Sequence, residues 1–188
     1  PLANDLSTAY THRHTHQQPP TWTPLPLQYT DYTQWQHQHL GNPTNPHSHL
    51  HHQLTHWTNT LTNLPTELPL PTDHPRPPTP THHGNRTTLT INPTTHHQLQ
   101  TLARHHDATL FITIHAAITT LLTRLGAGTD IPLGTVTAGR TDEALDPLIG
   151  FFVNTLVLRT TTTPTTTFTQ HLHHTRDTDL TAYDHQDL

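Results

Sequence analysis

The apolar residues in the first third of the chain recur at helical spacing. Apolar residues at positions 2, 6, 9 and 10 share one face of a helix over about residues 2–12. An aromatic stripe predicts a second helix over residues 29–40, which Gly41 would end. Three leucines and a tryptophan at 4-3-4 spacing predict a third, polar helix over residues 50–61.

Proline dominates residues 65–84, where seven prolines occur. Proline has no backbone N–H, and its ring clashes with the preceding helical turn, so this density excludes a helix or a central strand. We therefore expect a linker at residues 65–84 that joins one structural unit, residues 1–64, to a second, residues 85–188.

The second unit mixes predicted strands and helices. A short strand is expected at Thr87–Ile91, and Asn92 followed by Pro93 predicts the start of a helix. The further elements expected are a helix at Ala108–Leu125 with Thr109 as its N-cap, strands at Ile131–Thr137 and Phe151–Leu158, and, after a threonine tract at 160–167, a helix at Phe168–Ala182.

Two of these elements are the most apolar in the chain and should form its core. In Phe151–Leu158 both alternating faces are apolar, which is typical of a central strand covered on both sides. The order of elements predicts an α/β layered fold. The helix Ala108–Leu125 is predicted to be buried through a stripe of six apolar residues: Phe111, Ile114, Ile118, Leu121, Leu122 and Leu125.

The composition excludes several classes of protein. Of the 188 residues, 30% are hydrophobic and 11% are charged, while threonine (43) and histidine (22) are unusually frequent. The absence of cysteine excludes disulfides and thiolate metal sites, and no apolar run is long enough to span a membrane. A formal charge of −5 and few aromatic residues argue against a nucleic-acid partner.

The histidines invite a metal-binding interpretation, which the spacing does not support. No HExxH motif occurs, and the paired histidines lie in polar stretches that offer no buried supporting shell. We therefore expect no metal site. The pairs at i, i+4 spacing are about as many as random placement would give: His12/His16, His47/His51 and His52/His56.

Three blocks of sequence stand in an order that is found in a known family. They read YTDYTQW at residues 29–35, IGFFVNTLVLR at residues 149–159 and HQDL at residues 185–188. They resemble the YxD(F/Y)AxW, IGxFVNTLxLR and HQDxPFE blocks of nonribosomal peptide synthetase condensation domains. The matching positions are Tyr29, Asp31, Trp35, Gly150, Asn154, Arg159, His185, Gln186 and Asp187.

The resemblance implies both a fold and a reaction. The fold is similar to that of chloramphenicol acetyltransferase, a sandwich of two related α/β lobes with the active site between them. Residues 1–64 would end the first lobe, and residues 85–188 would begin the second. The reaction joins an acyl thioester donor on one carrier protein to the amine of an acceptor on the next.

The family's central histidine lies in an HHxxxDG block, which falls just before the stretch that matches Pro1–Tyr10. The sequence contains no such block, since His82 and His83 lack the aspartate and glycine that should follow. We therefore expect an internal fragment of a longer synthetase, inactive by itself and without a catalytic residue of its own.

Two residues are candidates for supporting the active site. By resemblance, Arg140 pairs with the aspartate of the HHxxxDG block and fixes that loop; the alternative is an exposed loop arginine. Asn154 lies in an apolar strand, where an amide needs partners, either in the substrate channel or in neighbouring backbone. Tyr29, Asp31 and Trp35 are expected to pack and cap.

The implied surroundings are those of a modular synthetase in the cytoplasm. No cofactor is expected to bind directly, because substrates arrive on the phosphopantetheine of carrier proteins. The expected partners are the upstream and downstream peptidyl carrier domains and the adjacent adenylation domain, with no nucleic acid and no membrane. A non-catalytic docking remnant of a synthetase stays open as the alternative, and a histidine-rich metal-binding polypeptide is the weaker one.

Overall fold

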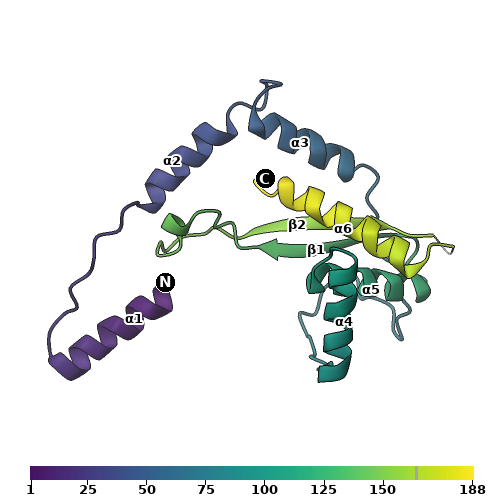
Figure 1. Cartoon of the computed structure of the whole chain (residues 1–188), viewed down its shortest axis with the longest axis horizontal. Helices are drawn as coiled ribbons and strands as arrows, with labels where there is room; N and C mark the ends of the chain where they lie inside the picture. Colours follow the sequence, from purple (N-terminus) through teal and green to yellow (C-terminus); the bar gives the residue numbers. More distant parts are fainter. Residues whose placement is uncertain (164) are drawn as a thin grey trace. The chain divides into compact units, whose positions relative to one another are not determined.

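A computed structural model describes residues 1–163 and 165–188 of the chain (Figure 1). Contacts divide the chain into two compact units, each assembled from separate segments. The first comprises residues 1–60, 136–156 and 185–188, and the second comprises residues 61–135 and 157–184. This division interleaves along the chain, and the lobe boundaries expected from the sequence remain a prediction.

The three helices expected in the first part of the chain are confirmed as α1 (Leu2–Thr11), α2 (Tyr29–Leu40) and α3 (His49–Thr60). A π-helical turn, His12–His16, follows α1. At the start of α2 the Asp31 carboxylate accepts the Gln28 N–H at 2.8 Å, so Asp31 caps the helix as expected. Helix α2 ends before Gly41, whose φ of +74° favours glycine there.

The core of the first unit forms around the start of α2 rather than along its length. Leu145, Leu148 and Phe152 are buried together, and Tyr29 and Tyr32 of α2 pack against them. Among the described residues, α1 and α2 contain no fully buried side chain and α3 buries only Gln53. Little buried apolar surface therefore stabilises the packing of these three helices.

The strand expected at Thr87–Ile91 is not formed. These residues have no helical or strand pairing and are exposed, with Leu89 87% accessible. An isolated apolar run has no ladder partner to satisfy its backbone groups, so its β-propensity alone does not order it. The proline-rich segment 65–84 before it also contains no helix or strand.

The second unit contains the better-packed helices, α4 (Pro93–His105), α5 (Leu110–Arg124) and α6 (Phe168–Asp184) (Figure 1). Both predicted N-caps are confirmed. The Asn92 side chain accepts the Thr95 N–H at 2.8 Å, and the Thr109 hydroxyl accepts the Ile112 N–H at 3.2 Å.

Helix α5 is confirmed, but the prediction of its buried face is wrong. Helices α4 and α6 pack against it, and Ile112, Ala116 and Leu172 form the buried cluster. Small and hydroxyl side chains on this face let the helices approach, and their polar atoms find partners on α6. Most of the predicted stripe is instead exposed: Phe111, Ile118, Leu121 and Leu125.

The two strands β1 (Asp130–Thr137) and β2 (Asn154–Thr161) pair with each other. The Thr162 N–H donates to Thr129 O at 2.8 Å and the Thr160 hydroxyl to Ile131 O at 3.4 Å, which is the order of an antiparallel pair. Arg159 of β2 binds Asp130 of β1 at 2.6 Å.

The prediction for the second strand is wrong at its start and on its faces. β2 begins at Asn154 instead of Phe151, because the Phe151 carbonyl accepts a hydrogen bond from the Tyr29 hydroxyl and Phe152 turns into the aromatic cluster. Only one face of β2 is fully buried, through Leu156, Leu158 and Thr160. Within the described residues its sheet has two strands, so β2 is not a central strand.

None of the helices in the described part of the chain combines the length and the apolar character that crossing a bilayer requires.

Candidate functional site

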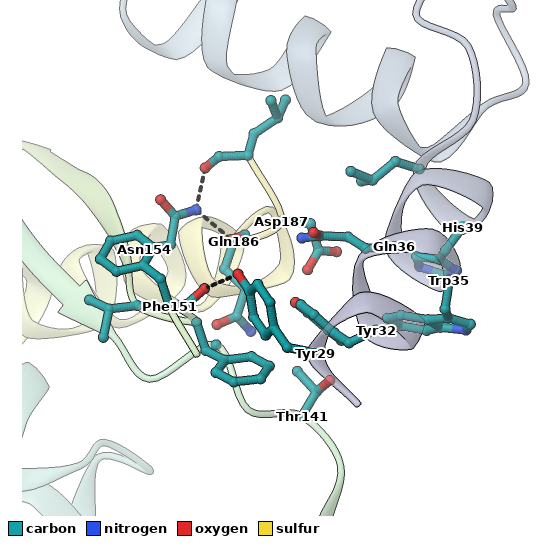
Figure 2. A pocket seen from close by; sticks show the side chains of 15 residues that line it. Tyr29, Tyr32, Trp35, Gln36, His39, Thr141, Phe151, Asn154, Gln186 and Asp187 are labelled. Atoms are coloured by element: carbon teal, nitrogen blue, oxygen red, sulfur yellow. Dashed lines mark hydrogen bonds between the residues drawn. The ribbon is translucent and has the colours of Figure 1, made fainter. Parts of the chain in front are cut away.

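Three stretches far apart in the sequence, together with Gly139 and Thr141, line one cavity of about 520 Å³ in the first unit (Figure 2). Helix α2 contributes Tyr29, Tyr32 and Trp35 among others, the loop before β2 contributes Phe151 to Asn154, and the last residues contribute Gln186 to Leu188. Each of these three stretches overlaps one of the three sequence blocks. The blocks that carry the family resemblance therefore meet at one place.

Tyr29 joins the first block to the second. Its hydroxyl donates to the Phe151 carbonyl at 2.8 Å, and its ring meets the Phe152 ring edge-on with centroids 5.3 Å apart (Figure 2). Gly150 leaves room for this contact, because a Cβ there would overlap the Tyr29 ring. Tyr29 and Gly150 thus fix the wall of the cavity by packing, as expected for Tyr29.

Arg140 contacts the residues that form this wall. Its half-buried guanidinium donates to the carbonyl oxygens of Leu145 and Leu148 and lies 4.0 Å from the centre of the Phe152 ring. Arg140 is therefore not a solvated loop arginine. Its pairing with the HHxxxDG aspartate stays a prediction, since the sequence contains no such block.

Asn154 joins the second block to the third. Its side-chain amide nitrogen donates to the carbonyl oxygens of Gln186, at 2.8 Å, and Leu188 (Figure 2). Its side-chain oxygen accepts the Thr155 N–H at 2.8 Å. The partners of Asn154 are thus neighbouring backbone groups. Because the side chain also lines the cavity, the two interpretations from the sequence are compatible.

The third block is held to α3. The Trp57 indole N–H donates to the His185 carbonyl at 2.7 Å, and the rings of His56 and His185 stack with centroids 3.8 Å apart. Burial and the neighbouring His185 lower the pKa of His56, so its ring favours the neutral form. Trp57 is half-buried as a result.

The cavity offers hydroxyl, amide and carboxylate groups on an aromatic wall. Burial, with smaller contributions from Tyr29 and Asp187, raises the pKa of the Tyr32 hydroxyl above its ordinary value. Tyr32 therefore keeps its proton near neutral pH and acts as a hydrogen-bond donor rather than as a base. Such a wall can bind and orient a polar chain with an apolar part.

The remaining family positions lie outside the lining or at its edge. Trp35 lies on the rim, 52% exposed, with its ring stacked on His39 at 5.0 Å. Arg159 belongs to the second unit, where its guanidinium also donates to Thr62 O at 2.8 Å, in keeping with a structural role. Sequence analysis missed Tyr32, Gln36, His39 and Thr141 as lining residues. Only helical spacing could have indicated three of them, because Tyr32, Gln36 and His39 share one stripe of the helix with Tyr29.

The family model that describes the condensation domain matches residues 2–188. The chain is 49% identical over all 188 residues to the dimodular nonribosomal peptide synthase of Bacillus subtilis (strain 168), and it spans 8% of that protein.

Two solved structures share the fold. One is the X-domain in the complex of the X-domain and OxyB from teicoplanin biosynthesis, with a TM-score of 0.88, 30% identity, and coverage of 99% of this chain and 41% of that one. The other is the condensation domain from the monacolin K polyketide synthase MokA, with a TM-score of 0.69, 21% identity, and coverage of 98% and 42%.

The family model, the similar synthetase and the shared fold agree with the three sequence blocks that meet at the cavity. The chain therefore belongs to the condensation domain family of nonribosomal peptide synthetases, an amide-bond-forming family with a chloramphenicol acetyltransferase-like fold.

Proposed function

We propose that this chain is part of an active condensation domain that joins a carrier-bound acyl thioester donor to the amine of a carrier-bound acceptor. The observation that supports it best is the cavity at which all three blocks meet. The volume of this cavity, about 520 Å³, lies in the range of small-molecule binding pockets.

The reaction needs a group that these residues do not supply. The acceptor amine attacks the thioester carbonyl, a C–N bond forms, the C–S bond breaks, and the proton of the amine must leave as the phosphopantetheine thiol departs. A group within hydrogen-bond reach of the amine would have to orient it or take the proton. By resemblance this is the histidine of HHxxxDG, so we expect the 188 residues alone to be inactive.

Arg140 and Asn154 are positioning residues in this proposal. Arg140 holds the Leu145–Phe152 segment through two carbonyl oxygens, and Asn154 holds the last residues of the chain against the start of β2. In the proposal, these two residues hold the walls of the cavity in fixed positions. Displacing a substrate by about 1 Å can cost on the order of 10²-fold in rate.

The proposed partners follow from the family. Donor and acceptor would arrive on the phosphopantetheine arms of an upstream and a downstream peptidyl carrier domain, beside an adenylation domain of the same synthetase. No other cofactor is proposed. The location in the cytoplasm, and the lobe boundaries 1–64, 65–84 and 85–188, belong to the same proposal.

The test is a condensation assay on the full polypeptide that carries these residues, with donor and acceptor loaded on carrier domains. Arg140→Ala and Asn154→Ala should each lower product formation by about 10–100-fold, mainly in kcat. Arg140→Lys should recover part of the rate, since lysine keeps the charge without the two-pronged geometry. Arg86→Ala is the matched control, because Arg86 lies in the exposed segment before α4.

Equal activity of Arg140→Ala and Arg86→Ala would remove Arg140 from the site. If the wild-type polypeptide forms no amide, or lacks an HHxxxDG block upstream, the proposal of an active condensation domain is wrong.

A docking role is the second candidate, and one observation favours it. The X-domain from teicoplanin biosynthesis, 30% identical to this chain, was solved in complex with OxyB. A domain of this fold can therefore present a surface to another protein. An inactive full polypeptide that nevertheless binds a protein of its own synthetase in pull-down would support docking over catalysis.

A further inference from the structure

Two histidines and an aspartate come together at the rim of the cavity. His39 lies in the last turn of α2, His49 is the first residue of α3, and Asp187 lies in the last block of the chain. Their nearest ligand atoms all lie within 4.8 Å of one another, and all three residues belong to the first unit. Because Asp187 lies 138 residues after His49, no metal-binding spacing motif in the sequence indicates this group.

The Nε2 atom of His49 has two close polar neighbours. Its Nε2 lies 2.6 Å from Asp187 Oδ2 and 3.2 Å from the side-chain amide nitrogen of Gln53. A ring nitrogen with a proton can donate to the carboxylate but cannot accept from the amide; without a proton the reverse holds. A cation at Nε2 would satisfy the carboxylate and the ring nitrogen together.

We propose that His39, His49 and Asp187 bind one divalent transition-metal ion, for which Zn²⁺ is the probe. Two imidazoles and a carboxylate are ligands that zinc prefers, with water at the fourth position. Metal–ligand lengths of about 2.0–2.1 Å set neighbouring ligand atoms roughly 3.3 Å apart in a tetrahedron. The His49–Asp187 contact would open slightly as the metal replaces its proton, and His39 would swing inward.

A neighbouring side chain already orients one of the ligands. The Trp35 ring stacks on the His39 ring with an angle of 10° between the planes. Such outer contacts keep metal ligands in a productive orientation. The rings of His39 and His49 are themselves 4.9 Å apart, centre to centre.

The proposed ion would have a structural effect. It would tie the end of α2, the start of α3 and the last block of the chain to one another. Since His39 and Asp187 also line the cavity, the ion would fix the rim of the space in which the substrate chains are proposed to lie. The inference does not depend on the catalytic proposal, because a docking domain would bind the ion equally well.

The test is a calorimetric Zn²⁺ titration of the full polypeptide that carries these residues and of its triple variant His39→Ala/His49→Ala/Asp187→Asn. The wild-type chain should bind one more ion at micromolar concentration or tighter, and that ion should raise the unfolding temperature. The other histidines supply a weak background in both proteins. The matched control, His96→Ala/His97→Ala/Asp107→Asn, removes the same residue types from and just after α4 and should behave as wild type.

A single substitution separates ligation from hydrogen bonding. His49→Gln can still donate to Asp187 but is a poor zinc ligand, so it should weaken the tight site at least about 10-fold. Bound Co²⁺ should show the visible absorption of a tetrahedral site in the wild-type chain and in the control only. Equal Zn²⁺ stoichiometry in the wild-type and triple-variant proteins would overturn the site, as would the absence of any saturable binding.

Discussion

At the scale of single residues, Gly139 shows how closely the cavity wall is built. It lies just after β1 with a φ of +62°, and a Cβ there would overlap the Phe152 carbonyl oxygen. Any side chain would therefore be strained in its backbone and would push Phe152 away from Arg140 and Tyr29. The absence of a side chain at Gly139 is a requirement of the packing.

Gly139→Ala should lower the free energy of unfolding by roughly 2–5 kcal/mol, the sum of left-handed strain and overpacking. Gly134→Ala is the control, because a Cβ at Gly134 meets no heavy atom within 4 Å and its φ is not positive. It should change stability by about 0.5 kcal/mol or less. Urea unfolding of both variants measures the difference, and equal stabilities would contradict the close approach seen at Phe152.

At the scale of elements, α5 and α6 are joined by buried polar contacts. His115 binds Asp179 at 2.9 Å, and the Thr119 hydroxyl lies 2.7 Å from His171 Nε2. Burial lowers the pKa of His171, and the nearby His174 and His115 lower it further, against a smaller effect of the Ala116 backbone. The folded state therefore favours the neutral ring more than the unfolded chain does.

This contact makes the stability of the helix pair depend on pH. The contribution of neutral His171 is fully present above its unfolded pKa of about 6.5 and is lost as the pH falls below that value toward the lower folded pKa. The loss is at most about 1.4 kcal/mol per pH unit. His171→Gln, which can keep the bond to Thr119, should flatten this part of the profile.

The measurement is urea unfolding of the two proteins between about pH 8 and pH 5. His96→Gln, at an exposed position of α4, is the control and should follow the wild-type profile. If His171→Gln and His96→Gln give the same slope, His171 does not carry the pH dependence. Groups remote from His171 titrate alike in all three proteins, so a difference in slope reports His171 together with the charges that interact with it.

At the scale of the whole molecule, burial is uneven. The described part of α1 and α2 has no fully buried residue, whereas α5 and α6 each bury five. Large apolar side chains remain exposed on both units, among them Leu6 at 62% and Leu121 at 55%. Such surfaces favour association and leave little to hold the outer helices.

In the isolated 188-residue chain, amide hydrogens of α1 and α2 should therefore exchange quickly, and those of α5 and α6 slowly. Thermal unfolding should be weakly cooperative, with a tendency to aggregate. Hydrogen exchange read by mass spectrometry resolves the helices separately. Uniform strong protection over residues 2–61 and 108–158 would show instead that the chain is a self-sufficient domain.

The sequence by itself determined the local structure, because local structure depends on neighbours along the chain. In the described part of the chain, the expected ranges match α1, α2, α3, α5 and α6 to within a few residues. The start of α4 was predicted from its cap, and the caps at Asn92 and Thr109 formed as predicted. The three blocks were also readable, since each is a continuous run, and they indicated the family before any geometry was known.

Only the tertiary structure decided which faces are buried and which blocks meet. The stripe on α5 was the more apolar one, yet α6 packs on the other face, where smaller side chains allow close approach and polar atoms find partners. Phe151 has a strong strand propensity, but its carbonyl accepts a hydrogen bond from the Tyr29 hydroxyl, and the strand starts later, at Asn154. The group of His39, His49 and Asp187 could not be foreseen at all, because contacts across 138 residues depend on how the segments fold together and not on their spacing.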